Sequence, residues 1–263
     1  MKTRKWTPFP HDAQAYRYAG PALLRAWPRL HRGDCEPAPA GKRRTELEEA
    51  WRAFHAGDFG LAIERGAALG PEGAAAANKA AGVYATYLAP TNAGAVTLLE
   101  QAVKRAEAAV EACPERANSH YFHAFVLGRF SQRISVAAAL AAGLGGKVQR
   151  SLERTLELER KHADAHIALG VFHAEVVAKV GALIGRLTYG ASADAAVRAF
   201  ETAVKLNPQS AIARLEYARS LELLYGRDRR DQVEKLLRAA IRCEPEDAME
   251  KLDLEAARAM LER

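Results

Sequence analysis

The histidines are the first candidates for chemistry in this sequence. His162, His166 and His173 are separated by steps of four and seven residues, so they can share one face of a helix. A zinc site needs three or four converging ligands, and the zincin motif needs Glu directly after its first His, where this chain has Ala163. His166 and His173 also occupy positions where helical repeats bury a large ring. We therefore expect packing histidines and no metal site.

A glycine-rich segment, Gly143-Leu144-Gly145-Gly146-Lys147, superficially resembles a phosphate-binding loop. The Walker spacing fails, because Ala141 stands where the first Gly must be and Val148 replaces the Ser or Thr that holds magnesium. Free backbone amides and Lys147 at a helix start could still hold an anion. The sequence also lacks a nucleophile elbow. We expect no enzymatic activity, no catalytic residues and no cofactor.

The elements that carry these residues follow a tandem helical pattern. Tetratricopeptide units place small residues where two antiparallel helices touch and larger ones in the gaps between them. One unit runs from Leu169-Gly170 through Ala196, Phe200 and Ala203 to Pro208, and the next runs from Tyr217-Ala218 through Val233, Leu237 and Ala240 to Pro245. Two matches in tandem predict an all-α, right-handed superhelical α-solenoid. We expect about five tetratricopeptide-like helix pairs and a C-terminal capping helix.

Two segments interrupt the repeats. Residues 135–146 and 176–190 are apolar and rich in glycine, and they fall at equivalent points of consecutive units. A long apolar connection should pack against something. Each insertion could extend the first helix of its own unit, or the two together could line the concave face and shape a pocket. Residues 1–41 are expected to form an N-terminal arm, helix and linker, and residues 42–263 the repeat domain.

Charge and cysteine usage restrict the class of protein. The net charge is +6, but the 38 Lys and Arg residues are interleaved with 32 Asp and Glu residues, which indicates solvated helix faces and no nucleic-acid footprint. Cys35, Cys113 and Cys243 are far apart and have no metal-type spacing. No apolar stretch follows the basic N-terminus, and no run approaches a membrane span. We expect a cytoplasmic protein without a membrane span.

From His120 to Leu254 the sequence resembles a particular tetratricopeptide-like family. This family includes the eukaryotic regulators of microtubule dynamics and the bacterial T components of tripartite periplasmic transporters. The matching features are His120-Tyr121-Phe122, Leu127-Gly128-Arg129, Leu169-Gly170, Tyr189-Gly190, Leu206-Asn207-Pro208 and Glu216-Tyr217-Ala218. The resemblance implies a helical scaffold with an adapter or ligand-carrying role, and no catalytic residues.

Recognition is the function that these observations leave. The leading hypothesis is a non-enzymatic scaffold that binds a peptide or protein segment in its concave groove. The alternative is a protein that binds an apolar or anionic small molecule in a pocket roofed by the two insertions. First-helix residues line the concave side of such solenoids. The candidate binding residues are Asn118, Tyr121, Phe125, Arg129, Asp164, Ile167, Val171, Glu175, Arg219 and Glu222.

Overall fold

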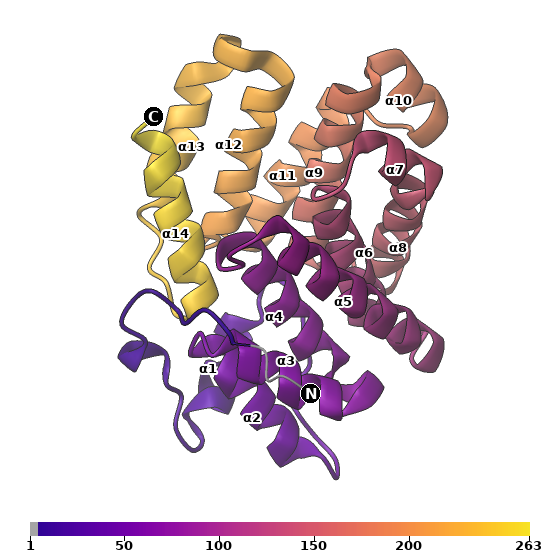
Figure 1. Cartoon of the computed structure of the whole chain (residues 1–263). Coiled ribbons are helices and arrows are strands. Elements are labelled where there is room, and N and C mark those ends of the chain that lie inside the picture. The colour runs from indigo at the N-terminus through magenta and orange to yellow at the C-terminus, as the bar shows by residue number, and fades with distance from the viewer. Residues whose placement is uncertain (1–4) are drawn as a thin grey trace.

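The computed structural model describes residues 5–263, and within this range the chain is helical and has no strand. Five antiparallel helix pairs follow one another along the chain (Figure 1). The pairs are α2 (Arg44–His55) with α3 (Phe59–Ala68), α4 (Ala74–Tyr87) with α5 (Asn92–Ala112), α6 (Ala117–Ser131) with α8 (Leu144–Leu158), α9 (Ala163–Val180) with α11 (Ala193–Leu206), and α12 (Ala211–Tyr225) with α13 (Arg230–Ala240). The all-α solenoid predicted from the repeats is confirmed.

Shorter elements surround these pairs. The 3-10 helix η1 (Gln14–Tyr16) and α1 (Ala22–Leu30) precede the first pair, and α14 (Ala248–Leu261) follows the last. Two further 3-10 turns, η2 (Gly70–Gly73) and η3 (Gly226–Arg229), connect helices.

Side-chain caps define where several of these helices begin. A side chain at the N-cap accepts a hydrogen bond from a backbone N–H in the first turn, which satisfies one of the donors that a helix start leaves free. This cap is present at Thr91, Ser135, His162, Ser192, Ser210 and Asp247. Local sequence therefore determines where four of the ten paired helices begin, namely α5, α9, α11 and α12.

The two insertions form short helices of their own. The first is α7 (Val136–Ala141), between α6 and α8, and the second is α10 (Ala182–Tyr189), between α9 and α11. α9 continues as far as Val180, so the second insertion begins as an extension of the first helix of its unit. Gly181 then takes a φ of +86°, a conformation that L side chains rarely adopt, and this turn separates α9 from α10.

The repeats pack through the small-to-large contacts that the pattern predicts. A Cβ atom at Gly170 would lie 2.7 Å from the ring of Phe200, so only glycine lets these helices approach so closely. Phe200 is fully buried and stacks on Tyr217 with ring centroids 5.1 Å apart. Gly170, Phe200 and Tyr217 therefore pack α9, α11 and α12 together.

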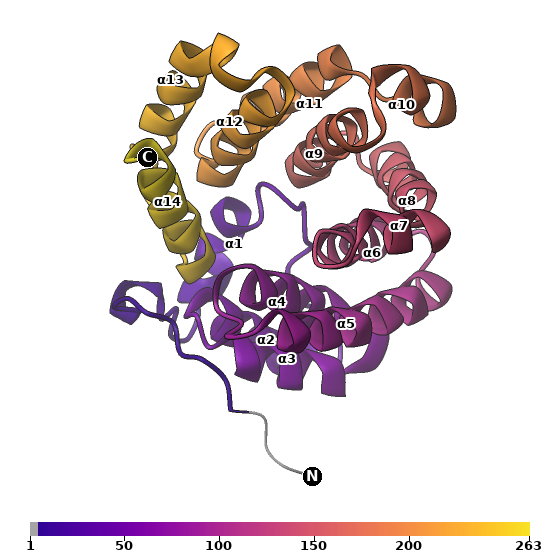
Figure 2. The same cartoon turned by 45° about the horizontal axis from the view of Figure 1, so that its top comes forward.

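The solenoid curves until its two ends meet. In Figure 2 the helix pairs are arranged in a ring around the α1 segment, and α14 lies beside the N-terminal helices. Tyr18 donates a hydrogen bond to the carbonyl oxygen of Glu246 at 2.6 Å, and Arg29 pairs with Glu250 at 2.8 Å. His55 and Asp247 form a buried contact at 2.9 Å. These contacts join residues more than 190 positions apart in the sequence and close the superhelix into a ring.

Candidate functional site

An apolar cavity of about 200 Å³ opens inside the ring. Its lining residues come largely from the first helices of successive pairs, α4, α6, α9 and α12, and from α14. Figure 2 shows these helices on the inner side of the ring. Most of its lining is aliphatic or aromatic and includes Val83, Phe125, Leu140, Leu144, Val148, Ile167, Val171, Phe172, Val176 and Tyr189. An engineered cavity of about 150 Å³ is large enough to hold benzene. This cavity can therefore hold at least a ring-sized apolar group.

Both insertions contribute walls to this cavity. Val136, Ala139 and Leu140 reach it from α7, while Val180 and Tyr189 reach it from the second insertion. The Tyr189 ring packs edge-on against Phe172, with centroids 6.0 Å apart. Gln149 on α8 also donates a hydrogen bond to the Tyr189 carbonyl oxygen at 3.2 Å. The segments that interrupt the repeat pattern thus cover one and the same cavity.

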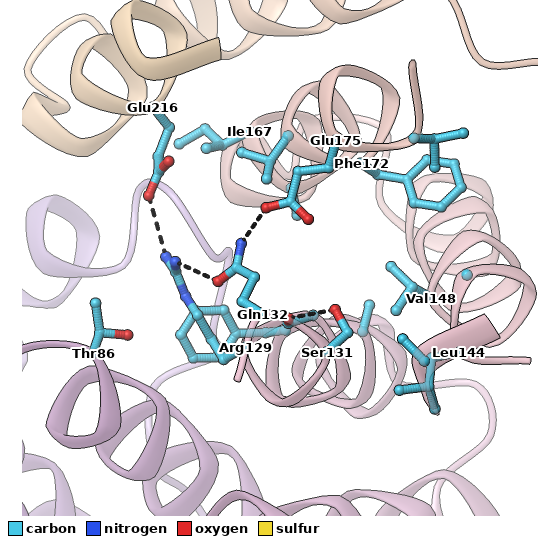
Figure 3. Close-up of a pocket in the computed structure, with 18 of the residues that line it drawn as sticks. Thr86, Arg129, Ser131, Gln132, Leu144, Val148, Ile167, Phe172, Glu175 and Glu216 are labelled. Atoms are coloured by element: carbon cyan, nitrogen blue, oxygen red, sulfur yellow. Dashed lines mark hydrogen bonds and ion pairs between the residues drawn. The ribbon is translucent and has the colours of Figure 1, made fainter. Parts of the chain in front are cut away.

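A chain of polar side chains crosses the ring beside the apolar surface. Arg129 donates to Glu216 at 3.4 Å and to Gln132 at 3.3 Å, and Gln132 donates to Glu175 at 2.6 Å. Figure 3 shows this chain linking α12, α6 and α9, with Leu144, Val148 and Phe172 grouped to one side of it. Lys179 completes the chain with an ion pair to Glu175 at 2.8 Å. The cavity therefore has an apolar body and a polar border.

The segment between α1 and α2 lies inside the ring and closes its inner side. Lys79 of α4 donates to Asp34 at 2.7 Å, and both side chains are buried. His31 contacts the other Asp34 oxygen at 2.9 Å. Burial alone would raise the pKa of Asp34, but Lys79 and His31 outweigh it and hold that pKa well below its usual range. Burial lowers the pKa of His31 to about 4, so the imidazole is neutral and donates its Nδ1 proton.

A second carboxylate from the same segment binds α6. Glu36 accepts hydrogen bonds from Arg116 and, at 2.6 Å, from the amide of Asn118. The Asn118 oxygen in turn contacts His162 at 2.8 Å. The backbone N–H of Asp164 donates to the Gly33 carbonyl oxygen at 3.0 Å. Residues 31–36 thus bind polar groups on the inner faces of α4, α6 and α9 that would otherwise be available to a binding partner.

Two further carboxyl groups line the cavity, and neither forms an ion pair with another residue in the described range 5–263. Burial raises the pKa of Asp164 to about 7, against the opposing effect of Lys79. Burial also raises the pKa of Asp253 to about 8, although the Tyr87 hydroxyl donates a hydrogen bond to it at 2.6 Å. At neutral pH Asp253 is therefore mostly protonated, and it presents an uncharged carboxyl group to the cavity.

Asp253→Asn is expected to raise the free energy of unfolding at pH 7 by about 1–2 kcal/mol. The folded pKa of about 8 lies above the usual value of 3.8. Protonation of Asp253 therefore stabilises the fold fully below about pH 4, and this contribution is lost as the pH rises toward 8. Asn keeps the acceptor for Tyr87 and has no proton to lose. Urea denaturation at pH 5 and pH 8 should show that Asp253→Asn raises the free energy of unfolding more at pH 8 than at pH 5.

The matched control for this measurement is Glu222→Gln. Glu222 is an exposed carboxylate on α12, and its amide variant should stay within about 0.5 kcal/mol of wild type at both pH values. An Asp253→Asn gain that is equal at both pH values would contradict the assignment of a protonated Asp253.

The structure brings most of the candidate binding residues together. The ones that line the cavity are Tyr121, Phe125, Arg129, Asp164, Ile167, Val171 and Glu175. Asn118 instead lies buried between Glu36 and His162, contrary to the expectation that it faces a groove. Arg219 pairs with Glu216 at 3.3 Å outside the cavity lining, and Glu222 is exposed.

Several lining residues were not among the candidates. Lys79, Gln132, Glu216 and Asp253 all reach the cavity. Repeat register could have indicated Glu216, which lies on the first helix of its pair, and Lys79, which is the only charged residue of the alanine-rich α4. No local signal marks Asp253, because it reaches the cavity only through the closure of the ring.

Within residues 5–263 no group of three or more His, Cys, Asp and Glu side chains is placed to hold a metal ion. None of the described helices combines the length and the hydropathy of a membrane span.

Comparison with known proteins identifies the family. The family model described as "Regulator of microtubule dynamics protein 1-3" matches residues 77–263. The chain belongs to this family. Among curated proteins, none matches the sequence significantly. The matched region of this regulator of microtubule dynamics family begins within α4, so it includes Lys79 but leaves out Asp34.

One solved structure supports a tetratricopeptide fold. The chain is similar to TTC0263, a thermophilic TPR protein of Thermus thermophilus, with a TM-score of 0.59 and 14% identity over 84% of this chain and 100% of the other. It is also similar to YrrB, a TPR protein with an unusual peptide-binding site, with a TM-score of 0.38 and 17% identity over 89% and 98%. The first of these likenesses supports the fold and nothing beyond it.

Proposed function

We propose that this chain is a non-enzymatic carrier that holds an apolar or amphipathic small molecule inside its closed superhelix. The observation that supports it best is the position of the two insertions. They interrupt consecutive repeats, and both contribute to the walls of the same cavity. Small-molecule sites are concave and mostly apolar, with a few placed polar groups. This cavity has that composition, with Arg129, Gln132 and Glu175 as its polar border.

The polar border suggests where the two ends of the ligand lie. The apolar part fits between Leu144, Val148 and Phe172, which Figure 3 shows on one side of the border. A hydroxyl, amide or acidic group would then lie at Arg129 and Gln132, where donors already converge. Arg129, which Glu216 partly neutralises, can donate hydrogen bonds to such a group without leaving an unpaired charge buried.

The scaffold hypothesis from the sequence, with a peptide in an open concave groove, receives less support. Residues 31–36 of the chain itself fill part of the inner face, where Lys79 binds Asp34 and Asn118 binds Glu36. A peptide would have to displace these buried contacts or use only the region near α7 and α10. The geometry therefore favours the carrier.

Ala139→Trp is expected to weaken ligand binding at least tenfold, a loss of roughly 1.4 kcal/mol or more. Ala139 lines the cavity from α7, and the indole would occupy the space that the ligand needs. The probe is anilinonaphthalene sulfonate, a dye with an apolar body and an anionic end, titrated by fluorescence. The matched control is Ala137→Trp, which changes an exposed position on the same helix and should bind the dye as wild type does.

Native mass spectrometry of protein purified gently from its source tests the same proposal without a chosen probe. A retained mass of a few hundred daltons in wild type that is lost in Ala139→Trp would support the carrier. A co-purifying polypeptide with no retained small molecule would contradict it and favour the scaffold hypothesis.

A further inference from the structure

The two insertions also carry an unusual concentration of exposed apolar side chains. On α10 the exposed fractions are 72% for Leu183, 58% for Ile184 and 78% for Leu187. On α7 they are 43% for Val136 and 51% for Leu140. In the described part of the chain, the other large hydrophobic residues exposed to this degree are Leu61 and Leu223. Large apolar side chains left in water at one place indicate an interaction surface.

Part of this apolar surface borders the cavity, through Val136 and Leu140 of α7. Figures 1 and 2 both show α7 and α10 at the same end of the molecule, where α6 and α9 finish. Val136 and Leu140 belong to both surfaces, since they line the cavity and are also exposed. Any body that covers this apolar surface therefore also contacts the wall of the cavity that α7 forms.

The charges within the two inserted segments are basic, and the nearest acidic residues, Glu153, Glu175 and Asp194, lie at their borders. The sequence has no Asp or Glu from 130 to 152 or from 176 to 193, although it has basic residues in both segments. Lys147 and Arg186 are exposed, and neither has an ion pair among the described residues. Lys179 also belongs to this region, but Glu175 neutralises it. An apolar face bordered by uncompensated basic residues is complementary to an anionic lipid surface.

We propose that the α7–α10 end of the molecule docks on the surface of an anionic lipid bilayer, with Leu183, Ile184 and Leu187 inserted at the headgroup boundary. Amphipathic helices of this kind insert their apolar face by about 5–10 Å without spanning the membrane. A second copy of the chain is a poorer occupant. A twofold interface would place Lys147 and Arg186 of both copies around the same apolar surface, and like charges would oppose each other.

This proposal rests on and extends the proposed function, because it places one wall of an apolar cavity against a source of apolar molecules. It does not depend on that function for its test. Docking is measured with vesicles, and cavity binding is measured with anilinonaphthalene sulfonate in their absence. If wild type binds vesicles and not the dye, the carrier proposal fails while the docking surface stands.

The test is co-sedimentation of the full chain with vesicles. We expect binding to vesicles of phosphatidylcholine mixed with phosphatidylserine, weaker binding to pure phosphatidylcholine, and a decrease with added salt. Leu183→Ser/Ile184→Ser/Leu187→Ser should reduce the partition coefficient by roughly tenfold or more. Lys147→Glu/Arg186→Glu should reduce it by about fivefold or more per residue. Because all five positions are exposed, these variants should keep the dye binding and helical content of wild type.

The control variant is Leu61→Ser, which removes an exposed leucine of α3 and should leave vesicle binding unchanged. Vesicle binding by the triple-serine variant at the wild-type level would overturn the proposal. The proposal would also be overturned if the wild-type chain bound neither kind of vesicle. This holds whether the chain sediments as a monomer or as a dimer that the triple-serine substitution dissociates.

Discussion

Lys79→Met is expected to lower the free energy of unfolding by about 3–5 kcal/mol at pH 7. The substitution keeps most of the side-chain volume and removes the ammonium group that binds Asp34 at 2.7 Å. Asp34 is completely buried, and Lys79 is the main group that holds its pKa well below the usual range. Without Lys79, a charged carboxylate would remain in the core with only the hydrogen bonds of His31 and the Glu36 backbone. Urea denaturation followed by far-UV circular dichroism measures the loss.

The double variant Lys79→Met/Asp34→Asn is the control for this prediction. Removing both charges takes away the unpaired carboxylate, so the double variant should be clearly more stable than the sum of the two single losses predicts. The segment between α1 and α2 should also become more accessible to trypsin at Lys42 and Arg43 in Lys79→Met than in wild type. A loss below about 1 kcal/mol for Lys79→Met would show that the pair contributes little to holding this segment inside the ring.

Gly66→Ala is expected to lower the free energy of unfolding by about 2–3 kcal/mol. A Cβ atom at this position would lie 2.7 Å from the Gly73 carbonyl oxygen and 2.9 Å from the backbone nitrogen of Ala77. Both neighbours are backbone atoms that cannot rotate away, so α3 and α4 would have to move apart. Part of the cost is offset, because alanine is favoured over glycine inside a helix by about 1 kcal/mol. The expected loss of about 2–3 kcal/mol is the net result of these two effects.

Gly128→Ala provides a comparison of opposite sign. Gly128 lies inside α6 in a helical conformation, and a Cβ atom there would meet no atom within 4 Å. Only the helix preference should then act, and it should raise stability by about 0.5–1 kcal/mol. Thermal denaturation of both variants compares them directly. Equal shifts in the same direction would mean that backbone approach at Gly66 does not decide the effect.

The repeat architecture could be predicted from the sequence because its signals are local. Helix caps such as Ser192 and Ser210 act within one turn, and glycine at 170 and phenylalanine at 200 have the sizes that a tetratricopeptide pair requires. Such contacts recur at fixed spacing, so they are visible without knowledge of the whole fold. The same register indicated Tyr121, Phe125 and Arg129 as inner-face residues, and all three line the cavity.

The placement of the N-terminal segment could not be predicted in this way. Residues 33–41 contain glycine and several prolines and read as a linker, yet Asp34 and Glu36 are buried inside the ring. Nothing local distinguishes a carboxylate that will pair with Lys79, 45 positions away, from one that faces water. The division of the chain at residue 41 stays a prediction, although Leu23 and Trp27 share one hydrophobic core with α2 and α4.

The sequence by itself determined the helix pairs and the two interruptions, because close packing within a pair acts between residues near one another in the chain. Only the tertiary structure decided that the solenoid closes, through His55 with Asp247 and Arg29 with Glu250. Closure depends on the accumulated curvature of all the repeats, and small angles at each pair add up to bring the ends together. That sum places both insertions over one cavity, with Asp253 from the last helix in its lining.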